Sequence, residues 1–217
     1  GDSVARREVN ARLTVLQGQL ENELHNAFDS ALWYRKHHQP KSLRQPDLNG
    51  LASELADRRF SECPILHSEL LNRHKPSGSA IAAQNILLRR MVLNEGEPRL
   101  GIVDFPAEGG LLASLLEGTG LYRRESDVWA FHAPDDDPSR LAPMWKAAMQ
   151  RIKRQRKRPI SMVEVYDVWR APPYGVKDGL MPILGVAFVL SQRESLAIYR
   201  EGVFCARFDD VDVEYLA

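Results

Sequence analysis

The residues with the most distinctive chemistry are cations clustered between positions 146 and 158. This stretch has no acid and seven cations, namely Lys146, Arg151, Lys153, Arg154, Arg156, Lys157 and Arg158. Such a series can follow a phosphate backbone, because each cation that neutralises a phosphate releases a condensed counterion. The alternative is a solvated helix face whose last cations favour the helix C-terminus. Seven cations without an acid exceed what that role requires, so we predict contact with nucleic acid or another polyanion.

Two other segments carry residue types that bind ions, but each has a simpler explanation. Residues 75–79 precede an expected helix and could hold a phosphate on free backbone N–H groups. They lack the G-x-x-x-x-G-K-[ST] pattern of a nucleotide-binding loop, so we expect an ordinary turn with Ser79 as the helix cap. Asp135, Asp136 and Asp137 could bind a divalent ion, but acids followed by Pro138 are typical of a helix start.

The remaining candidates concern metal binding and catalysis. Cys63, His67 and His74 are spaced by four and seven residues, so two of them could share a helix face as metal ligands. Pro64 and the missing fourth ligand count against such a site. No Ser, His and acid grouping can be selected from spacing, and the G-x-S-x-G motif is absent. We therefore expect no catalytic residue, no metal and no cofactor, with an enzyme of unrecognised site as an alternative.

The elements that position the cations are expected in the order of a winged helix, in which three helices are followed by a hairpin called the wing. They are a helix opened by Pro138, an extended piece at Ile160, helices over 163–169 and 179–192, and strands over 196–200 and 203–208. The seven cations would lie on and after the first of these helices.

Residues 80–132 repeat this order without one of the helices. The expected elements are a helix over 80–93, a strand over 100–105, a helix over 111–118 and a hairpin of 121–124 with 128–132, with shorter helices before them over 51–59 and 65–73. Two related modules in tandem is the simplest account. The predicted fold class is therefore mainly α with small β-hairpins (α+β).

A long amphipathic helix is expected before the modules. Its apolar stripe recurs at steps of three and four residues and comprises Val9, Leu13, Leu16, Leu20, Leu24, Phe28, Ala31 and Leu32. Ser3 could cap this helix, which we expect to end near Lys36. The predicted domains are a long helix and linker over 1–45, a first winged-helix-like module over 46–134 and a second winged-helix module over 135–217.

The third helix of the second module argues against sequence-specific DNA reading. In a DNA-reading winged helix, the third helix offers Arg, Asn, Gln or Lys to base edges in the major groove. Residues 179–190 are instead apolar on nearly all sides, and the nearest cations, Lys177 and Arg193, lie beyond the two ends. Such a helix is normally buried. Two kinds of contact remain possible: contact of the cations with the DNA backbone, or contact of this helix with another protein.

Composition limits the classes of protein further. The 29 Lys and Arg residues balance 29 Asp and Glu residues, so a nucleic-acid surface requires local segregation of charge. Cys63 and Cys205 offer no disulfide framework, which fits a reducing cytosol. No apolar run reaches the roughly 20 residues of a membrane span, and we expect no signal peptide, because the first residues lack its basic and apolar regions. We expect a cytoplasmic protein without membrane contact, and the missing initial methionine favours a piece of a longer chain.

Three groups of short motifs resemble a known family. They are 68–73 (SELLNR) with 77–80 (SGSA); 100–102 (LGI) with 108–111 (EGGL) and 120–122 (GLY); and 172–179 (PPYGVKDG) with 197–204 (AIYREGVF). This pattern is similar to the region downstream of the nucleotide-binding domain in large bacterial P-loop ATPases of anti-phage defence islands. The resemblance implies winged-helix modules that couple a motor elsewhere in the chain to DNA or to partner subunits. Since this sequence has no phosphate loop and no Walker B strand, it implies no ATP hydrolysis here.

These observations lead to one principal hypothesis and two alternatives. The principal hypothesis is a non-catalytic winged-helix segment of a larger bacterial ATPase. Its partners would be the rest of that protein or other subunits, together with DNA contacted through its backbone by residues 146–158. The first alternative is a protein-interaction module built on the apolar helix over 179–190 and on the first helix, through which a homodimer is expected. The second is an enzyme with an unrecognised site.

Overall fold

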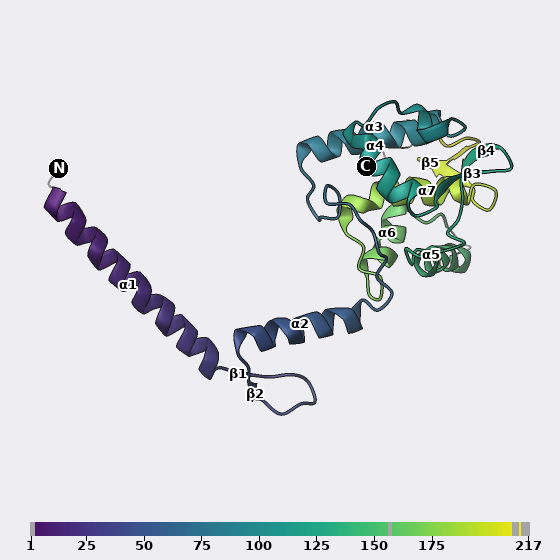
Figure 1. The fold of residues 1–217 in the computed structure, drawn as a ribbon. Helices are drawn as coiled ribbons and strands as arrows, with labels where there is room; N and C mark the ends of the chain where they lie inside the picture. The colour runs from purple at the N-terminus through teal and green to yellow at the C-terminus, as the bar shows by residue number, and fades with distance from the viewer. Residues whose placement is uncertain (1–2, 156–157, 210–212, 214–217) are drawn as a thin grey trace. The chain divides into compact units, whose positions relative to one another are not determined.

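The computed structural model describes residues 3–155, 158–209 and 213 of the chain. The chain forms two compact units, Gly1–Arg59 and Phe60–Ala217 (Figure 1). The structure is mainly helical, with small antiparallel two-stranded sheets and a long N-terminal helix, which confirms the predicted α+β class at this level. In the described part of the chain, no helix combines the length and apolar character needed to cross a bilayer.

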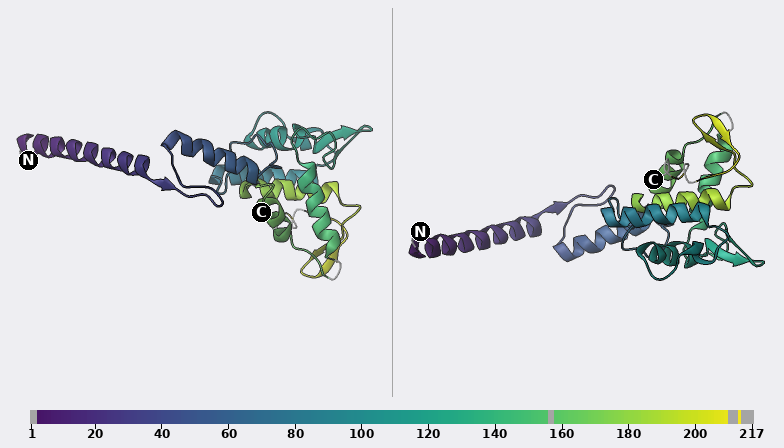
Figure 2. Two further views of the ribbon diagram at one scale, coloured as in Figure 1. Left: turned by 90° about the horizontal axis from the view of Figure 1, so that it is seen from below. Right: turned by 90° about the horizontal axis from the view of Figure 1, so that it is seen from above.

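The first unit contains α1 (Ser3–Ser30), β1 (Leu32–Trp33), β2 (Lys41–Ser42) and α2 (Gln45–Arg59). Figure 2 shows α1 as one continuous helix, and none of its residues is buried. The helix ends at Ser30 rather than near Lys36, because the chain turns there into the short β1–β2 hairpin. Ser42 Oγ fixes this turn by donating a hydrogen bond to the carbonyl of Asp29 at 2.7 Å.

The second unit holds the remaining elements. They are α3 (Gly78–Leu93), η1 (Pro98–Gly101), α4 (Ala107–Leu112), η2 (Ala113–Glu117), β3 (Tyr122–Glu125), β4 (Val128–Phe131), α5 (Ala142–Arg154), α6 (Met162–Arg170), η3 (Asp178–Leu180), α7 (Met181–Ser191), β5 (Ile198–Arg200) and β6 (Val203–Cys205). Both predicted hairpins are present, with Tyr122 opposite Phe131 in β3–β4 and Ile198 opposite Cys205 in β5–β6.

The core of the second unit is built around α7. Every residue from Met181 to Leu190 is buried, and α7 contacts α3 and β4 as well as α6 and η3. The predicted first and second modules therefore cover the same helix and share one hydrophobic core. This double cover explains why the α7 sequence is apolar on all sides. The helix is not an exposed protein-binding face, so that part of the protein-interaction alternative is wrong.

Hydrogen-bonded caps explain where α5 and α6 begin. The Asp137 carboxylate accepts the N–H groups of Leu141 and Ala142 at 2.7 and 2.6 Å, where negative charge favours a helix N-terminus. The predicted acidic helix start is therefore present, although the helix begins at Ala142 and not at Pro138. α6 begins with a capping box, in which Ser161 Oγ accepts the Glu164 N–H and the Glu164 side chain accepts the Ser161 N–H.

Three predicted elements differ in the structure. Residues 65–73 form irregular structure with a turn at 69–71 instead of a helix. The predicted strand over 100–105 is replaced by η1, because Arg99, Leu100 and Gly101 all have positive φ angles and turn the chain. No strand is described at Ile160, which lies directly before the Ser161 cap. Each hairpin of the second unit consequently lacks the third strand that a complete winged-helix sheet would have.

Candidate polyanion-binding face and ion-pair clusters

The structure separates the predicted cations by position. Lys146, Arg151, Lys153 and Arg154 lie on α5, Arg158 lies between α5 and α6, and Arg156 and Lys157 lie outside the described residues. The five cations that the structure describes also differ in what their side chains contact.

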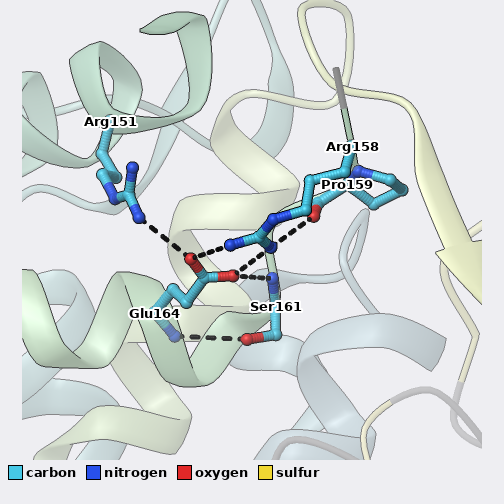
Figure 3. Close-up of polar contacts among 5 residues, drawn as sticks. All are labelled: Arg151, Arg158, Pro159, Ser161 and Glu164. Carbon is cyan, nitrogen blue, oxygen red and sulfur yellow. Dashed lines mark hydrogen bonds and ion pairs between the residues drawn. The ribbon is translucent and has the colours of Figure 1, made fainter. Parts of the chain in front are cut away.

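Arg151 and Arg158 converge on the carboxylate of Glu164 near the start of α6 (Figure 3). Arg151 Nη2 lies 3.0 Å from Glu164 Oε1. Arg158 makes a bidentate contact, with Nη1 2.8 Å from Oε2 and Nη2 3.0 Å from Oε1. The Ser161 N–H donates to Oε2 at 3.3 Å. One carboxylate thus accepts bonds from two guanidinium groups and a backbone amide, and we call these four residues the Glu164 cluster.

The donors of the Glu164 cluster stabilise the charged carboxylate. The hydrogen bond from Arg158, with that from the Ser161 backbone, lowers the pKa of Glu164 from its ordinary value to about 2. The same bond to Glu164 raises the pKa of Arg158. Two of the cations predicted to contact phosphate are therefore paired within the protein, and a phosphate would have to compete with Glu164 for them.

Lys146, Lys153 and Arg154 behave differently, because all three are exposed. They lie with the exposed Gln150 on the solvent face of α5, at steps expected for one side of a helix. None of the three forms an ion pair within the described residues, and Lys153 and Arg154 also favour the C-terminal end of the helix dipole. We call Lys146, Lys153 and Arg154 the α5 cationic face.

Two tryptophans fix the orientation of this face. The rings of Trp145 on α5 and Trp169 on α6 stack with centroids 5.5 Å apart. Trp169 Nε1 donates to the carbonyl of Met144 at 3.0 Å, and Trp145 Nε1 lies 3.2 Å from Ser191 Oγ at the end of α7. Since the apolar side of α5 is held against α6 and α7, its cations are directed to solvent.

A cavity of about 410 Å³ lies beside the Glu164 cluster, between the end of α5, the start of α6, α7 and the β5–β6 hairpin. Its lining is mostly apolar and includes Ile160, Val165 and Phe188, with Arg158 and Arg200 as cations. Arg158 is paired with Glu164, and Arg200 lies 2.8 Å from Asp209. The other titratable side chains that line it are Tyr199 and Glu201, both on the β5–β6 hairpin.

A second ion-pair cluster, which the sequence did not indicate, joins the two halves of the unit. Arg193, just after α7, makes a bidentate contact with Glu95, just after α3, at 2.7 and 2.8 Å. Glu95 Oε1 also accepts the N–H of Phe131 on β4 at 3.3 Å. The Glu95 carboxylate is largely buried, being 17% exposed. The Arg193 side chain is 52% exposed, and the Glu95 carboxylate joins the ends of α3 and α7 to β4 through these contacts.

His132 lies beside this cluster and is unusual in its hydrogen bonding. Its Nδ1 atom is 3.0 Å from Glu125 Oε2, whereas its Nε2 atom is buried and has no partner among the described residues. Burial, with the positive charge of Arg123, lowers the pKa of this imidazole. Both observations are consistent with a neutral ring that carries its proton on Nδ1. Its Nε2 atom then has no N–H group that would be buried without a partner.

The other candidate residues are not brought together. His74 Nδ1 lies 3.1 Å from Asp178 Oδ2, and Cys63 Sγ contacts the carbonyl of its neighbour Pro64. Within the described ranges, no three His, Cys, Asp or Glu side chains are placed to hold a metal. The turn over 75–79 serves as a helix start whose cap is Ser77, which accepts the Ala80 N–H at 3.3 Å. The predicted cap, Ser79, is therefore wrong.

The ion-pair residues that the sequence reasoning missed differ in how they could have been found. Glu164 follows Ser161 with the S-x-x-E spacing of a capping box. This spacing could have predicted a carboxylate close to the end of the cationic run. Glu95 and Arg193 carry no local signal, because their contact depends on the path of the chain between them.

Comparison of the chain with protein-family models, with curated proteins and with solved structures found no match.

Proposed function

We propose that this chain is a non-catalytic, cytoplasmic segment of a larger bacterial ATPase of the anti-phage defence type, built from tandem winged-helix-like modules. It mediates assembly with the rest of that protein or with partner subunits, and it contacts DNA through the phosphate backbone. The motif resemblance supports the ATPase context. The order α5, α6, α7 and then the β5–β6 hairpin supports a winged helix, in which three helices precede the wing.

The observation that carries the DNA proposal is the contrast between α5 and α7. The α5 cationic face is exposed, whereas α7, which holds the position of a reading helix, is buried from Met181 to Leu190. A helix without an exposed side cannot place donors against base edges in a groove. Contact through cations on another helix depends only on the charge of the phosphates. The binding we propose is therefore independent of sequence and sensitive to salt.

The test is the salt dependence of binding to an unspecific DNA duplex. The triple variant Lys146→Gln, Lys153→Gln and Arg154→Gln removes the α5 cationic face. We expect it to lower the slope of log affinity against log salt by about 0.9 for each phosphate contact that is lost. Duplexes of different sequence should bind the unchanged protein with similar affinity.

A matched control removes the same charge from other surfaces. Lys75→Gln, Arg124→Gln and Arg207→Gln change three exposed cations that do not lie on α5, and this variant should keep the original slope. If the unchanged protein does not bind DNA even at low salt, the DNA part of the proposal is wrong. Equal slopes for the two triple variants would show that net charge, and not the α5 face, is responsible.

The ATPase context has its own test. The reading frame that encodes these residues, or a gene beside it, should encode a P-loop and a Walker B strand outside residues 1–217. Copurification of that motor with this segment would support the assembly role. A frame and neighbourhood without any P-loop protein would contradict this part of the proposal and favour the protein-interaction alternative.

A further inference from the structure

Within the first unit, no described element covers the apolar stripe of α1. Val9, Leu13, Leu16, Leu20, Leu24 and Phe28 are each more than half exposed, and no residue of α1 is buried. The helix is 28 residues long, which corresponds to about 42 Å at 1.5 Å per residue. Helices in water gain most of their stability by packing an apolar face, and a stripe of this length is suited to packing against a second helix.

The charges of α1 indicate what that partner is. On or beside the apolar stripe, Arg6 and Arg12 lie in the N-terminal half of the helix and Glu21 and Glu23 lie in the C-terminal half, whereas Arg7, Glu8 and Asp29 lie on the opposite side. The first turn contains no acid and the last turn contains no cation. This arrangement is the reverse of the one that favours the dipole of the helix itself. It matches a second α1 that runs in the opposite direction.

The spacing of Arg12 and Glu23 makes the match specific. They are eleven positions apart, which is about three helical turns, so both flank the apolar stripe on the same side. In an antiparallel pair with Leu16 opposite Leu20 of the second copy, Arg12 of each helix lies near Glu23 of the other. Arg12 already contacts Glu8 through Nε at 3.0 Å, and its remaining N–H groups are free to reach across.

Arg6 distinguishes the two possible directions. It lies close to the apolar stripe, so a parallel pair would bring two Arg6 side chains together. In the antiparallel pair it lies near the C-terminus of the other helix, whose carbonyl groups favour a cation and whose own last turn supplies none. We propose that α1 pairs with α1 of a second copy of this chain in antiparallel orientation. This interface is independent of DNA binding and of the ATPase context.

Light scattering and charge reversal on the full chain without DNA test the pairing. The unchanged chain should be a dimer, and Arg12→Glu or Glu23→Arg alone should weaken dimerisation about tenfold, because each reversal places like charges together at two symmetric positions. A mixture of the two variants should form heterodimers of restored stability. Arg7→Glu is the matched control, since this exposed arginine faces away from the stripe and its reversal should leave dimerisation unchanged.

Cysteine cross-linking tests the direction in a Cys63→Ser, Cys205→Ser background. Chains with Val9→Cys mixed with chains with Ala27→Cys should cross-link, whereas Val9→Cys chains alone should not. In the antiparallel pair two copies of position 9 lie about 27 Å apart along the axis. A chain that stays monomeric at all concentrations would overturn the proposal, as would cross-linking of Val9→Cys with itself. Dimers that are insensitive to the reversals at Arg12 and Glu23 would also overturn it.

Discussion

Glu164 accepts hydrogen bonds from two guanidinium groups that belong to the cationic run between residues 146 and 158. A carboxylate six residues after Arg158 changes the meaning of that run, because charge counted along the sequence is not charge presented to solvent. The run contributes the α5 cationic face on one side and an internal ion-pair cluster on the other. Any polyanion would meet the first of these and compete for the second.

The Glu164 cluster gives a pH-dependent contribution to stability. Its carboxyl has a pKa lowered to about 2 in the folded protein, compared with about 4.3 in an unfolded chain. The stabilisation is therefore complete above the unfolded value and is lost as the pH falls from about 4 towards 2. We expect Glu164→Gln to lower the melting temperature at pH 7, with a difference from the unchanged protein that shrinks at pH 3.

Glu69→Gln provides the control for this pH dependence, because it removes a carboxylate from an exposed position. Its melting temperature should follow that of the unchanged protein at every pH. A Glu164→Gln variant with the same deficit at pH 3 as at pH 7 would mean that the lost charge is not the cause.

At the scale of elements, glycines in α1 and α7 have opposite roles. A Cβ atom at Gly185 of α7 would lie 2.5 Å from the hydroxyl oxygen of Tyr166 on α6, whereas a Cβ at Gly18 of α1 would meet nothing within 4 Å. The first glycine allows two helices to approach closely. The second only adds flexibility to a helix interior.

We therefore expect Gly185→Ala and Gly18→Ala to change stability in opposite directions. Gly185→Ala should destabilise the second unit by about 1–3 kcal/mol through overpacking against Tyr166. Gly18→Ala should stabilise α1 by about 0.5–1 kcal/mol, because alanine loses less conformational freedom in a helix. Thermal unfolding followed by circular dichroism measures both changes, and a loss of stability for both variants would contradict the account of Gly18.

At the scale of the whole molecule, the second unit combines elements of both predicted modules in one core, whereas residues 46–59 of the predicted first module lie in the first unit. The α7 helix contacts α3 and β4 from the first module and α6 from the second, and the Glu95–Arg193 pair links the ends of α3 and α7. Elements that share a buried helix lose their packing together. We therefore expect residues 60–217 to unfold in a single cooperative transition.

Leu87 on α3 tests this cooperativity, because it is fully buried in the shared core. Leu87→Ala should destabilise the unit by about 2–5 kcal/mol and increase hydrogen exchange in α5 and α6 as well as in α3. Leu93→Ala on the same helix is the control, since Leu93 is 63% exposed and its loss should have little effect. Faster exchange confined to α3 and its neighbours in the first module would show that the modules unfold separately.

Local sequence patterns were sufficient for most of the helices and for both hairpins of the second unit. The apolar residues of α5 predict its buried side, the Asp137 region predicts its capped start, and the composition of residues 179–190 predicts that α7 is buried. These features depend on residues a few positions apart, because helix caps and the spacing of apolar residues on one face are local to one or two helical turns. The same reasoning failed at residues 100–105, where the left-handed conformation of Arg99, Leu100 and Gly101 turns the chain and no extended strand forms.

The tertiary structure decided what covers α7 and which cations face solvent. Nothing local indicates that α3 and β4 pack on α7, or that Glu95 meets Arg193, because these contacts join segments far apart in the chain. The division of the cationic run also needed the fold, since Arg151 is paired only when α6 packs beside α5. The sequence by itself determined the amounts of charge and apolar surface. The packing of α6 beside α5 pairs Arg151 and Arg158 with Glu164. Of the cations described in the run, Lys146, Lys153 and Arg154 therefore remain exposed to a partner.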